Sequence, residues 1–234
     1  MGVIKEAIIL AGGLGTRLRA AVPDLPKCLA PVGGRPFIGY VTEHFRREGI
    51  ERFIFALGYK SDHFDEFFQA EFPNGGYDIS LEEEPLGTGG AIRQACERVE
   101  GKTVLVLNGD TFFRIGLEAL ADFHAEKQAD CSLCLKPMRD FDRFGVVELT
   151  DDGRVSRFRE KQYYPSGLIN GGVYALDKTA LLRKERPKVF SFEKDYLEAD
   201  GEDRLYGLVQ DRYFIDIGIP EDYLRVQQEL NELS

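Results

Sequence analysis

A glycine-rich segment near the start of the chain has the residues needed to hold phosphate groups. The apolar run Ala7 to Ala11 leads into Gly12-Gly13-Leu14-Gly15-Thr16-Arg17-Leu18. Glycines let backbone N–H groups approach a polyphosphate closely, because no side chain intervenes. Leu18 replaces the third glycine of Gly-x-Gly-x-x-Gly, and no Gly-Lys-Ser/Thr follows, so this is neither of the two commonest phosphate loops. A tight turn without a ligand explains the glycines about equally well.

Two cations near this loop favour the phosphate interpretation. Arg17 ends the loop, and Lys27 follows Pro26, whose ring fixes the backbone. A guanidinium can donate two hydrogen bonds to phosphate oxygens and stabilise departing pyrophosphate. Each cation alone is more often a solvated surface residue. Their occurrence together in a chain of net charge −10 indicates an anion site.

Two aspartates are candidate metal ligands. Asp110 follows the apolar run 104–107, at the carboxyl end of an expected strand, where open α/β sheets bind ligands. Asp216 lies inside the apolar run 213–217, where an unpaired charge would be unfavourable. Mg²⁺ takes one or two carboxylates plus phosphate oxygens, so this pair predicts a magnesium site. Each aspartate alone is equally explained as a turn former or helix cap.

The elements that would position these residues alternate along the first half of the chain. The expected strands are 7–11, 53–57, 104–108, 131–135, 146–149, 155–158, 173–176 and 213–217. The expected helices are 37–48, 61–72, 89–99 and 192–198, with a last helix that starts at Pro220. Alternating strands and helices predict an α/β fold around a mostly parallel sheet. Asp151-Asp152-Gly153 predicts a hairpin between two of the later strands.

The composition excludes several classes of protein. With 234 residues, of which 43% are hydrophobic, the chain can bury the core of one large domain. The acidic net charge argues against a nucleic-acid surface, which needs clustered Lys and Arg. The chain has no apolar run of about eighteen residues and no signal-peptide zones at its N-terminus. We therefore expect a cytoplasmic protein that binds neither nucleic acid nor membrane.

The four cysteines are too few and too scattered for a disulfide framework. Cys131 and Cys134 match Cys-x-x-Cys, but they lie in an expected strand. Residues three apart in a strand point to opposite faces, so the two thiols should not meet. No second cysteine pair completes a zinc site, although His124 lies upstream. We expect reduced thiols with structural roles.

The loop and its companions, from Leu10 to Leu18 and then Pro26-Lys27, resemble the sugar-1-phosphate nucleotidyltransferase family. The resemblance covers essentially the whole chain. It implies a Rossmann-like three-layer sandwich of GT-A-like type, with a mixed, mostly parallel central sheet. It also implies one domain, in which residues 1–130 mainly bind the nucleotide and residues 131–234 mainly bind the sugar phosphate. Cys28 stands where members usually have a second proline, a departure that affects loop stiffness and keeps Lys27 in place.

The resemblance also implies site residues. The catalytic residues would be Arg17, Lys27 and the metal-binding pair Asp110 and Asp216. The nucleotide would be bound by Leu10, Ala11, Gly12, Gly13, Gly15, Thr16, Glu82, Pro85, Gly87, Thr88 and Asn108. The sugar phosphate would be bound by Gly145, Glu160, Lys161, Asn170 and Gly171. Lys161 would pair with the 1-phosphate, while Glu160 and Asn170 would bind sugar hydroxyls. Taken alone, Glu160-Lys161 is most often a surface pair.

Glu82 is the residue from which we predict guanine. Its two oxygens can accept from guanine N1–H and N2–H₂, a pattern that cytosine and adenine do not offer and uracil or thymine offer only singly. Glu84 is the substitute for this role. A solvated acidic turn explains the segment Glu82-Glu83-Glu84 about equally well.

Within the family, the segments 108–113, 140–145 and 213–223 look most like the branch that transfers GMP from GTP to a D-glycero-α-D-manno-heptose 1-phosphate. Pyrophosphate would leave, and the nucleotide sugar would serve surface polysaccharide synthesis. Rivals are mannose-1-phosphate guanylyltransferases and uridylyl or cytidylyl relatives. The chain stops soon after its last expected helix, which disfavours relatives with a C-terminal left-handed β-helix. Assembly into a homo-oligomer stays open.

Proteins of two other classes are alternatives. A non-catalytic nucleotide-sugar sensor would be favoured by loss of Arg17, Lys27 or either aspartate, and all four residues are present. A glycosyltransferase should show an Asp-x-Asp motif after a strand. Asp140-Phe141-Asp142 follows the polar stretch 136–139 instead of an apolar run, so this class ranks lower.

Overall fold

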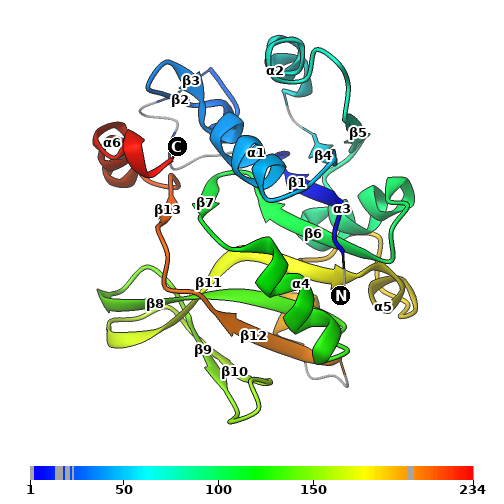
Figure 1. Cartoon of the computed structure of the whole chain (residues 1–234), viewed down its shortest axis with the longest axis vertical. Helices are drawn as coiled ribbons and strands as arrows, with labels where there is room; N and C mark the ends of the chain where they lie inside the picture. Colours follow the sequence, from blue (N-terminus) through cyan, green and yellow to red (C-terminus); the bar gives the residue numbers. More distant parts are fainter. Residues whose placement is uncertain are drawn as a thin grey trace.

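The computed structural model describes residues 3–13, 18, 22, 24–58, 60–199 and 203–233. A seven-stranded sheet forms its centre (Figure 1). In spatial order its strands are β12 (Leu205–Val209), β8 (Cys131–Phe141), β11 (Tyr164–Asp177), β6 (Thr103–Asn108), β1 (Glu6–Leu10), β4 (Arg52–Leu57) and β5 (Tyr77–Leu81). β11 runs antiparallel to both of its neighbours, and the other pairs are parallel. The predicted mixed, mostly parallel sheet is confirmed.

Three two-stranded ribbons accompany this sheet. They are β2 (Pro31–Val32) with β3 (Arg35–Pro36), β7 (Thr111–Phe113) with β13 (Phe214–Asp216), and β9 (Val146–Leu149) with β10 (Val155–Arg159). The predicted hairpin is confirmed by the antiparallel pairing of β9 and β10. Its turn contains Gly153, whose φ of +84° lies in the left-handed region that glycine adopts without strain.

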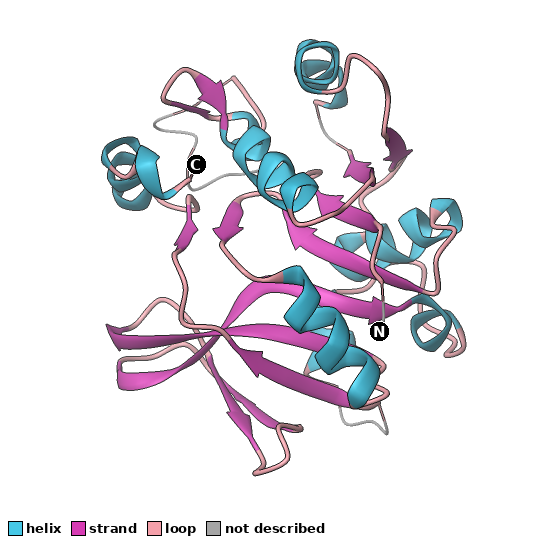
Figure 2. Ribbon diagram, viewed as in Figure 1, coloured by secondary structure: helices cyan, strands magenta, loops and turns pink. Residues whose placement is uncertain are grey.

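Helices cover both faces of the sheet. They are α1 (Phe37–Arg47), α2 (Asp65–Glu71), α3 (Gly87–Ala95), α4 (Leu117–Glu126), α5 (Lys178–Leu182) and α6 (Pro220–Gln228). Short 3₁₀ helices are η1 (Lys27–Leu29), η2 (Ser61–Phe64), η3 (Cys96–Arg98) and η5 (Leu230–Glu232), and η4 (Glu193–Leu197) is a π-helix. Figure 2 shows α1 and α4 in front of the strands. The wider turn of η4 replaces the ordinary helix that the sequence predicts at 192–198.

The two large hydrophobic cores show that the molecule has three layers, and a third, smaller cluster contains Phe141, Val146, Tyr164 and Ile169. One core joins the sheet to α1, α2 and α4, and the other joins it to α3 and α5. Along β1, Ile9 faces the first core and Ile8 the second. Side chains alternate in this way because successive residues of a strand point to opposite faces. The predicted three-layer α/β sandwich is confirmed.

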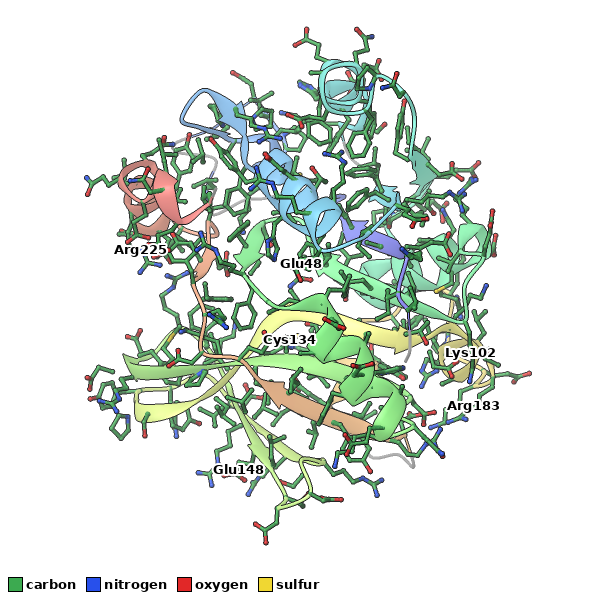
Figure 3. All side chains as sticks on the ribbon, in the orientation of Figure 1. Glu48, Lys102, Cys134, Glu148, Arg183 and Arg225 are labelled. Atoms are coloured by element: carbon green, nitrogen blue, oxygen red, sulfur yellow. The ribbon has the colours of Figure 1, made fainter. Side chains whose placement is uncertain are left out.

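Cys131 and Cys134 lie on opposite faces of β8, as the strand pattern predicts. Cys131 belongs to the core with α3 and Cys134 to the core with α1. Cys134 is labelled in Figure 3, where it lies in the interior near α4. All four cysteines are buried and reduced.

One expectation about the strands is wrong. β8 does not end at Leu135 but continues through the polar stretch to Phe141, so Asp140 and Phe141 lie within a strand and Asp142 follows it. β11 supplies pairing partners along this whole stretch, from Leu135 opposite Asn170 to Phe141 opposite Tyr164. The second half of β8 is polar and is stabilised by pairing with β11, so the sequence contains no apolar run that would predict it. Asp140 is nevertheless engaged, because its Oδ1 accepts a hydrogen bond from the Tyr163 hydroxyl at 3.0 Å.

The sequence did not predict α4, α5, β2, β3, β5, β7 or β12. In the part of the chain that the structure describes, no helix is long and apolar enough to cross a membrane.

Candidate active site

Lys27 lies between two carboxylates at the centre of the candidate site. Its Nζ is 2.5 Å from Asp110 Oδ2 and 3.6 Å from Asp216 Oδ1. The lysine side chain is 13% exposed, whereas 36% of the Asp110 side chain remains open to a ligand. Three residues expected to be catalytic therefore meet in one place, although they come from distant parts of the chain.

Strand pairing brings the two aspartates together. β13 runs antiparallel to β7, and the register places Asp216 opposite Thr111, the residue after Asp110. The N–H of Ile217 also donates to the carbonyl of Asp110 at 3.0 Å. The two carboxylates are thus held by main-chain hydrogen bonds on a short ribbon at the end of β6.

Gly109 joins this ribbon to the glycine-rich loop. Its N–H donates to the carbonyl of Leu10, at the end of β1, over 3.0 Å. A Cβ at this position would lie 2.7 Å from the same oxygen. A larger residue would push the Asp110 turn away from β1, so the close approach of two backbones requires glycine here.

Burial and charge act in opposite directions on this cluster. Burial, followed by the neighbouring charge of Asp110, raises the pKa of Asp216, and Lys27 works against that rise. Asp216 Oδ1 also accepts from the N–H of Gly218 at 2.6 Å. Burial, followed by the charge of Asp110, raises the pKa of Cys28 to about 12. The thiol beside Lys27 therefore stays protonated, which makes it unsuitable as a nucleophile.

The two carboxylates suit a hard divalent cation. Mg²⁺ prefers oxygen ligands and is often held by one or two carboxylates together with phosphate oxygens. Asp110 and Asp216 already direct an oxygen each toward one cation, the ammonium of Lys27. Within the described ranges, no group of three or more His, Cys, Asp or Glu side chains could hold a metal. A Mg²⁺ ion here would complete its coordination with phosphate oxygens and water.

A cavity of about 370 Å³ opens beside Asp110. It is lined by Leu10, Gly12, Gly13, Ala56, Glu82, Pro85, Gly87, Thr88, Ala91, Asn108, Asp110 and Glu193. Most residues expected to bind the nucleotide are therefore brought together. Ala11 is buried, and its N–H donates to the carbonyl of Ala56 at 3.0 Å. Gly15, Thr16 and Arg17 lie outside the described residues.

Glu82 faces the glycine-rich loop across this cavity. Its Oε2 accepts from the N–H of Leu86 at 2.9 Å, and a Cβ on Gly12 would lie 3.0 Å from its Oε1. Burial raises the pKa of Glu82. Glu84, the substitute for guanine recognition, is exposed and lies 4.0 Å from Lys188 Nζ instead of lining the cavity.

The loop at the start of α3 is pressed against Phe190. The N–H of Gly89 donates to the carbonyl of Phe190 at 3.0 Å, and the N–H of Phe190 donates to Leu86 at 3.1 Å. A Cβ on Gly87 would lie 2.6 Å from the carbonyl of Phe190, and Gly87 has a φ of +69°. The shape of the cavity wall is therefore set by a segment from the second half of the chain.

Asn170 and Gly171, two of the expected sugar-phosphate residues, belong to a segment of β11 that reaches the wall of this cavity at Gly172. The register of β11 against β8 shifts between Asn170 and Tyr174, which leaves a bulge containing Gly171 and Gly172. A Cβ on Gly172 would lie 2.8 Å from Nδ2 of Asn108, a residue that lines the cavity. The bulge thus brings the expected sugar motif against the expected nucleotide motif.

Gly145, Glu160 and Lys161 form the more open part of the expected sugar site. A Cβ on Gly145 would lie 2.4 Å from the carbonyl of Arg159, so the segment before Glu160 passes directly beside Gly145. Glu160 and Lys161 are exposed, and the Tyr164 hydroxyl donates to the carbonyl of Glu160 at 2.9 Å. None of the three lines the cavity beside Asp110.

Glu193 is a cavity residue that the sequence did not reveal. It lies in η4 and accepts from the Thr88 hydroxyl at 2.7 Å, a partner that is 105 positions away. Nothing local distinguishes this glutamate from the charged residues around it. The π-helix, a geometry that is frequent at functional sites, is detectable only in the structure.

The chain resembles known proteins along nearly its full length. A family model described as nucleotidyl transferase matches residues 6–232. The D-glycero-alpha-D-manno-heptose 1-phosphate guanylyltransferase of Aneurinibacillus thermoaerophilus is 43% identical over 226 residues, which cover 96% of this chain and 98% of that protein. The protein of the same name from Campylobacter jejuni is 42% identical over 218 residues, covering 93% of this chain and 96% of that one.

A solved structure is also similar. HddC from Yersinia pseudotuberculosis superposes with a TM-score of 0.88 at 34% identity, covering 97% of this chain and 100% of that chain. A second crystal structure of HddC is complexed with GMP-PN and gives the same TM-score of 0.88.

Proposed function

We infer the reaction from one premise: the chain belongs to the nucleotidyl transferase family. We propose that it transfers GMP from GTP to D-glycero-α-D-manno-heptose 1-phosphate and releases pyrophosphate. The observation that carries this proposal is the near full-length similarity, above 40% identity, to two guanylyltransferases named for that sugar phosphate. The cluster of Lys27, Asp110 and Asp216 beside a cavity supplies the charges that such a transfer needs.

The transfer is a substitution at phosphorus. An oxygen of the sugar 1-phosphate attacks the α-phosphorus of GTP, a new P–O bond forms, and the bond to the β-phosphate oxygen breaks. The attacking oxygen is already ionised, so no protein base or nucleophile is required. Catalysis therefore depends on positioning the two substrates and neutralising their phosphates.

Lys27 is the described cation best placed for this neutralisation. Its ammonium lies against Asp110 and Asp216, so it is held close to the place where phosphates would enter. We assign Arg17 to the β- and γ-phosphates and Lys161 to the sugar 1-phosphate, as the family resemblance implies. Asp110 and Asp216 would hold Mg²⁺, which when bound withdraws charge from the phosphate oxygens.

Guanine is assigned to the part of the cavity beside Glu82. The partly buried carboxylate has an oxygen near Gly12, and its other oxygen already accepts from Leu86. Guanine N1–H and N2–H₂ are donors that match such an acceptor. The complex of the similar HddC structure with GMP-PN supports the same nucleotide for this chain.

The acceptor sugar is assigned to the region between the β11 bulge and Gly145. Asn170 and Glu160 would bind its hydroxyl groups, and Gly145 and Gly171 leave room for backbone contacts. Mannose 1-phosphate shares the ring of the manno-heptose, and the similarity to the two heptose 1-phosphate guanylyltransferases favours the heptose compound.

A pyrophosphate-release screen tests the proposal. The purified chain is incubated with Mg²⁺, each of GTP, ATP, UTP and CTP, and a panel of sugar 1-phosphates that includes the manno-heptose and mannose compounds. We expect the highest kcat/KM with GTP and the heptose 1-phosphate. Preference for UTP or CTP would overturn the assignment of guanine, and preference for mannose 1-phosphate would overturn that of the acceptor. Absence of release with every pair would indicate a non-catalytic sensor.

A further inference from the structure

Glu193 lies at the junction of the two half-sites. It lines the cavity together with Thr88 and Asn108, residues assigned to the nucleotide. Phe192, the residue before it, packs against Tyr174 with 5.2 Å between the two ring centroids. The Tyr174 hydroxyl in turn accepts from Asn170 Nδ2 at 2.9 Å. Glu193 thus lines the nucleotide cavity on a segment that packs against the partner of Asn170.

A ring of hydrogen bonds fixes one oxygen of this carboxylate. Oε2 of Glu193 accepts from the Thr88 hydroxyl at 2.7 Å and from the Ser191 hydroxyl at 3.1 Å. The Thr88 oxygen itself accepts from the N–H of Phe192 at 2.8 Å, and the Ser191 oxygen accepts from the N–H of Lys194 at 3.1 Å. Both hydroxyl protons are therefore directed at Oε2, which orients the whole carboxylate.

The second oxygen is left for a ligand. Among the residues that the structure describes, no hydrogen bond or ion pair reaches Oε1 of Glu193. An ionised carboxylate is an acceptor only, so it can serve N–H and O–H donors but not phosphate oxygens. Beside a ribose and a hexose-like ring, the abundant uncharged donors are hydroxyl groups.

We propose that Glu193 is a specificity-determining residue whose Oε1 accepts a hydrogen bond from a substrate hydroxyl at the junction of the nucleotide and sugar sites. This inference rests on the proposed function, because it requires a ribose and a sugar phosphate bound together. The hydroxyl belongs either to the ribose of the nucleotide or to the acceptor sugar. The shared chemistry is recognition of an O–H donor by an oriented carboxylate.

Glu193→Gln tests this inference and keeps the hydrogen bonds from Thr88 and Ser191. The amide oxygen keeps the Thr88 and Ser191 hydroxyls as its donors, which turns the NH₂ group toward the substrate. A charged acceptor is thereby replaced by a neutral group of the same shape, which can donate to the hydroxyl oxygen but no longer makes the stronger charge-assisted hydrogen bond. Glu185→Gln is the matched control, because Glu185 is an exposed glutamate on the segment before η4.

The measurement is KM and kcat for both substrates, with deoxy analogues of each. We expect Glu193→Gln to raise the KM of one substrate about 10- to 100-fold, with a smaller change in kcat and an unchanged melting temperature. Glu185→Gln should behave as the unmodified enzyme. Removing the recognised hydroxyl should reduce kcat/KM clearly more in the unmodified enzyme than in Glu193→Gln, because the variant has already lost the charge-assisted part of the contact.

The analogues identify the source of the hydroxyl. If Glu193→Gln no longer prefers GTP over 2′- or 3′-deoxy-GTP, the recognised hydroxyl belongs to the ribose. If the variant no longer prefers the sugar 1-phosphate over its deoxygenated analogue, the hydroxyl belongs to the acceptor sugar. Unchanged discrimination with every analogue, or unchanged KM for both substrates, would overturn the inference. An unmodified enzyme without activity would instead refute the proposed function, so the two failures are distinguishable.

Discussion

At the scale of single residues, the site is organised by a lysine that two carboxylates hold in place. Lys27 contacts both Asp110 and Asp216, and it is more buried than either of them. Two acids this close would repel each other without a cation, which is why the charge of Asp110 raises the pKa of Asp216. A cation is therefore part of the stable arrangement of this site, with or without substrate.

Asp110→Ala should abolish metal-dependent pyrophosphate release. The change removes the more exposed carboxylate of the pair, and loss of one preorganised charged group typically lowers turnover on the order of 10²-fold or more. Release is measured with GTP and the heptose 1-phosphate over a range of Mg²⁺ concentrations. Asp151→Asn, at an exposed position in the β9–β10 turn, is the control and should keep normal rates. Normal release by Asp110→Ala would rule out the metal assignment.

Glu82→Gln should weaken the preference for guanine. An amide NH₂ group cannot accept from guanine N1–H or N2–H₂, so kcat/KM for GTP should fall about tenfold or more. ITP lacks the 2-amino group, so the ratio of kcat/KM for GTP over ITP isolates this contact. That ratio should fall in Glu82→Gln and persist in Glu84→Gln. The reverse result would assign guanine recognition to Glu84.

At the scale of elements, the sequence predicted those that carry their own pattern and missed those that depend on a partner. β1, β4 and β6 are buried on both faces, so they appear as continuous apolar runs. β7 has three residues and is defined by its pairing with β13, a contact between segments about a hundred positions apart. Glu193 was missed for the same reason, because its hydrogen-bond partner Thr88 is distant in the sequence and close only in the folded chain.

The contact between α3 and the segment before η4 predicts an unusual effect of Gly90→Ala. Glycine to alanine inside a helix normally stabilises by about 1 kcal/mol. Here the new Cβ would lie 2.6 Å from the carbonyl of Lys188 and 2.8 Å from Cβ of Leu86. We expect a loss of about 1–3 kcal/mol in the free energy of unfolding, measured by urea denaturation.

Gly116→Ala is the comparison for this variant, because the nearest atom to its Cβ would be 4.0 Å away. It should change the free energy of unfolding less than Gly90→Ala does. A gain in stability in Gly90→Ala would contradict the close packing of the cavity wall.

The contact between α4 and β8 predicts a pH dependence of stability. His124 is buried and hydrogen-bonded to the Ser132 hydroxyl at 3.0 Å, and burial lowers its pKa from 6.5 to about 4. The unfolded chain binds this proton at a higher pH than the folded chain, so stability falls as the pH drops from 6.5 toward 4. Between pH 7 and pH 5 this one histidine should account for about 2 kcal/mol.

His124→Gln should therefore lose less stability than the unmodified chain between these two pH values, as measured by urea denaturation. His63→Gln, at a partly exposed position, should keep the original slope. Equal slopes in all three proteins would show that His124 is not held neutral by the fold.

At the scale of the whole molecule, the faces of the sheet stabilise the fold and the carboxyl ends of its strands carry the candidate site. Its two faces bury the two cores, and the carboxyl ends of β1 and β6 present the cavity and the aspartates. Alternating apolar runs were enough to predict an α/β fold around a mostly parallel sheet, because such a pattern repeats along many residues, whereas the three-layer sandwich was implied by the family resemblance. The detailed shape of the cavity could not be predicted, since Glu193 lines it and Phe190 packs against Gly87 in its wall, both from the second half of the chain.

The central claim is that this arrangement makes a nucleotide sugar from GTP and a manno-heptose 1-phosphate. The most direct test is to incubate the enzyme with these two compounds and Mg²⁺, and to quantify the products by mass spectrometry and pyrophosphate assay. We predict GDP-D-glycero-α-D-manno-heptose and pyrophosphate in equal amounts. Consumption of GTP without a nucleotide sugar, or no consumption at all, would contradict the claim.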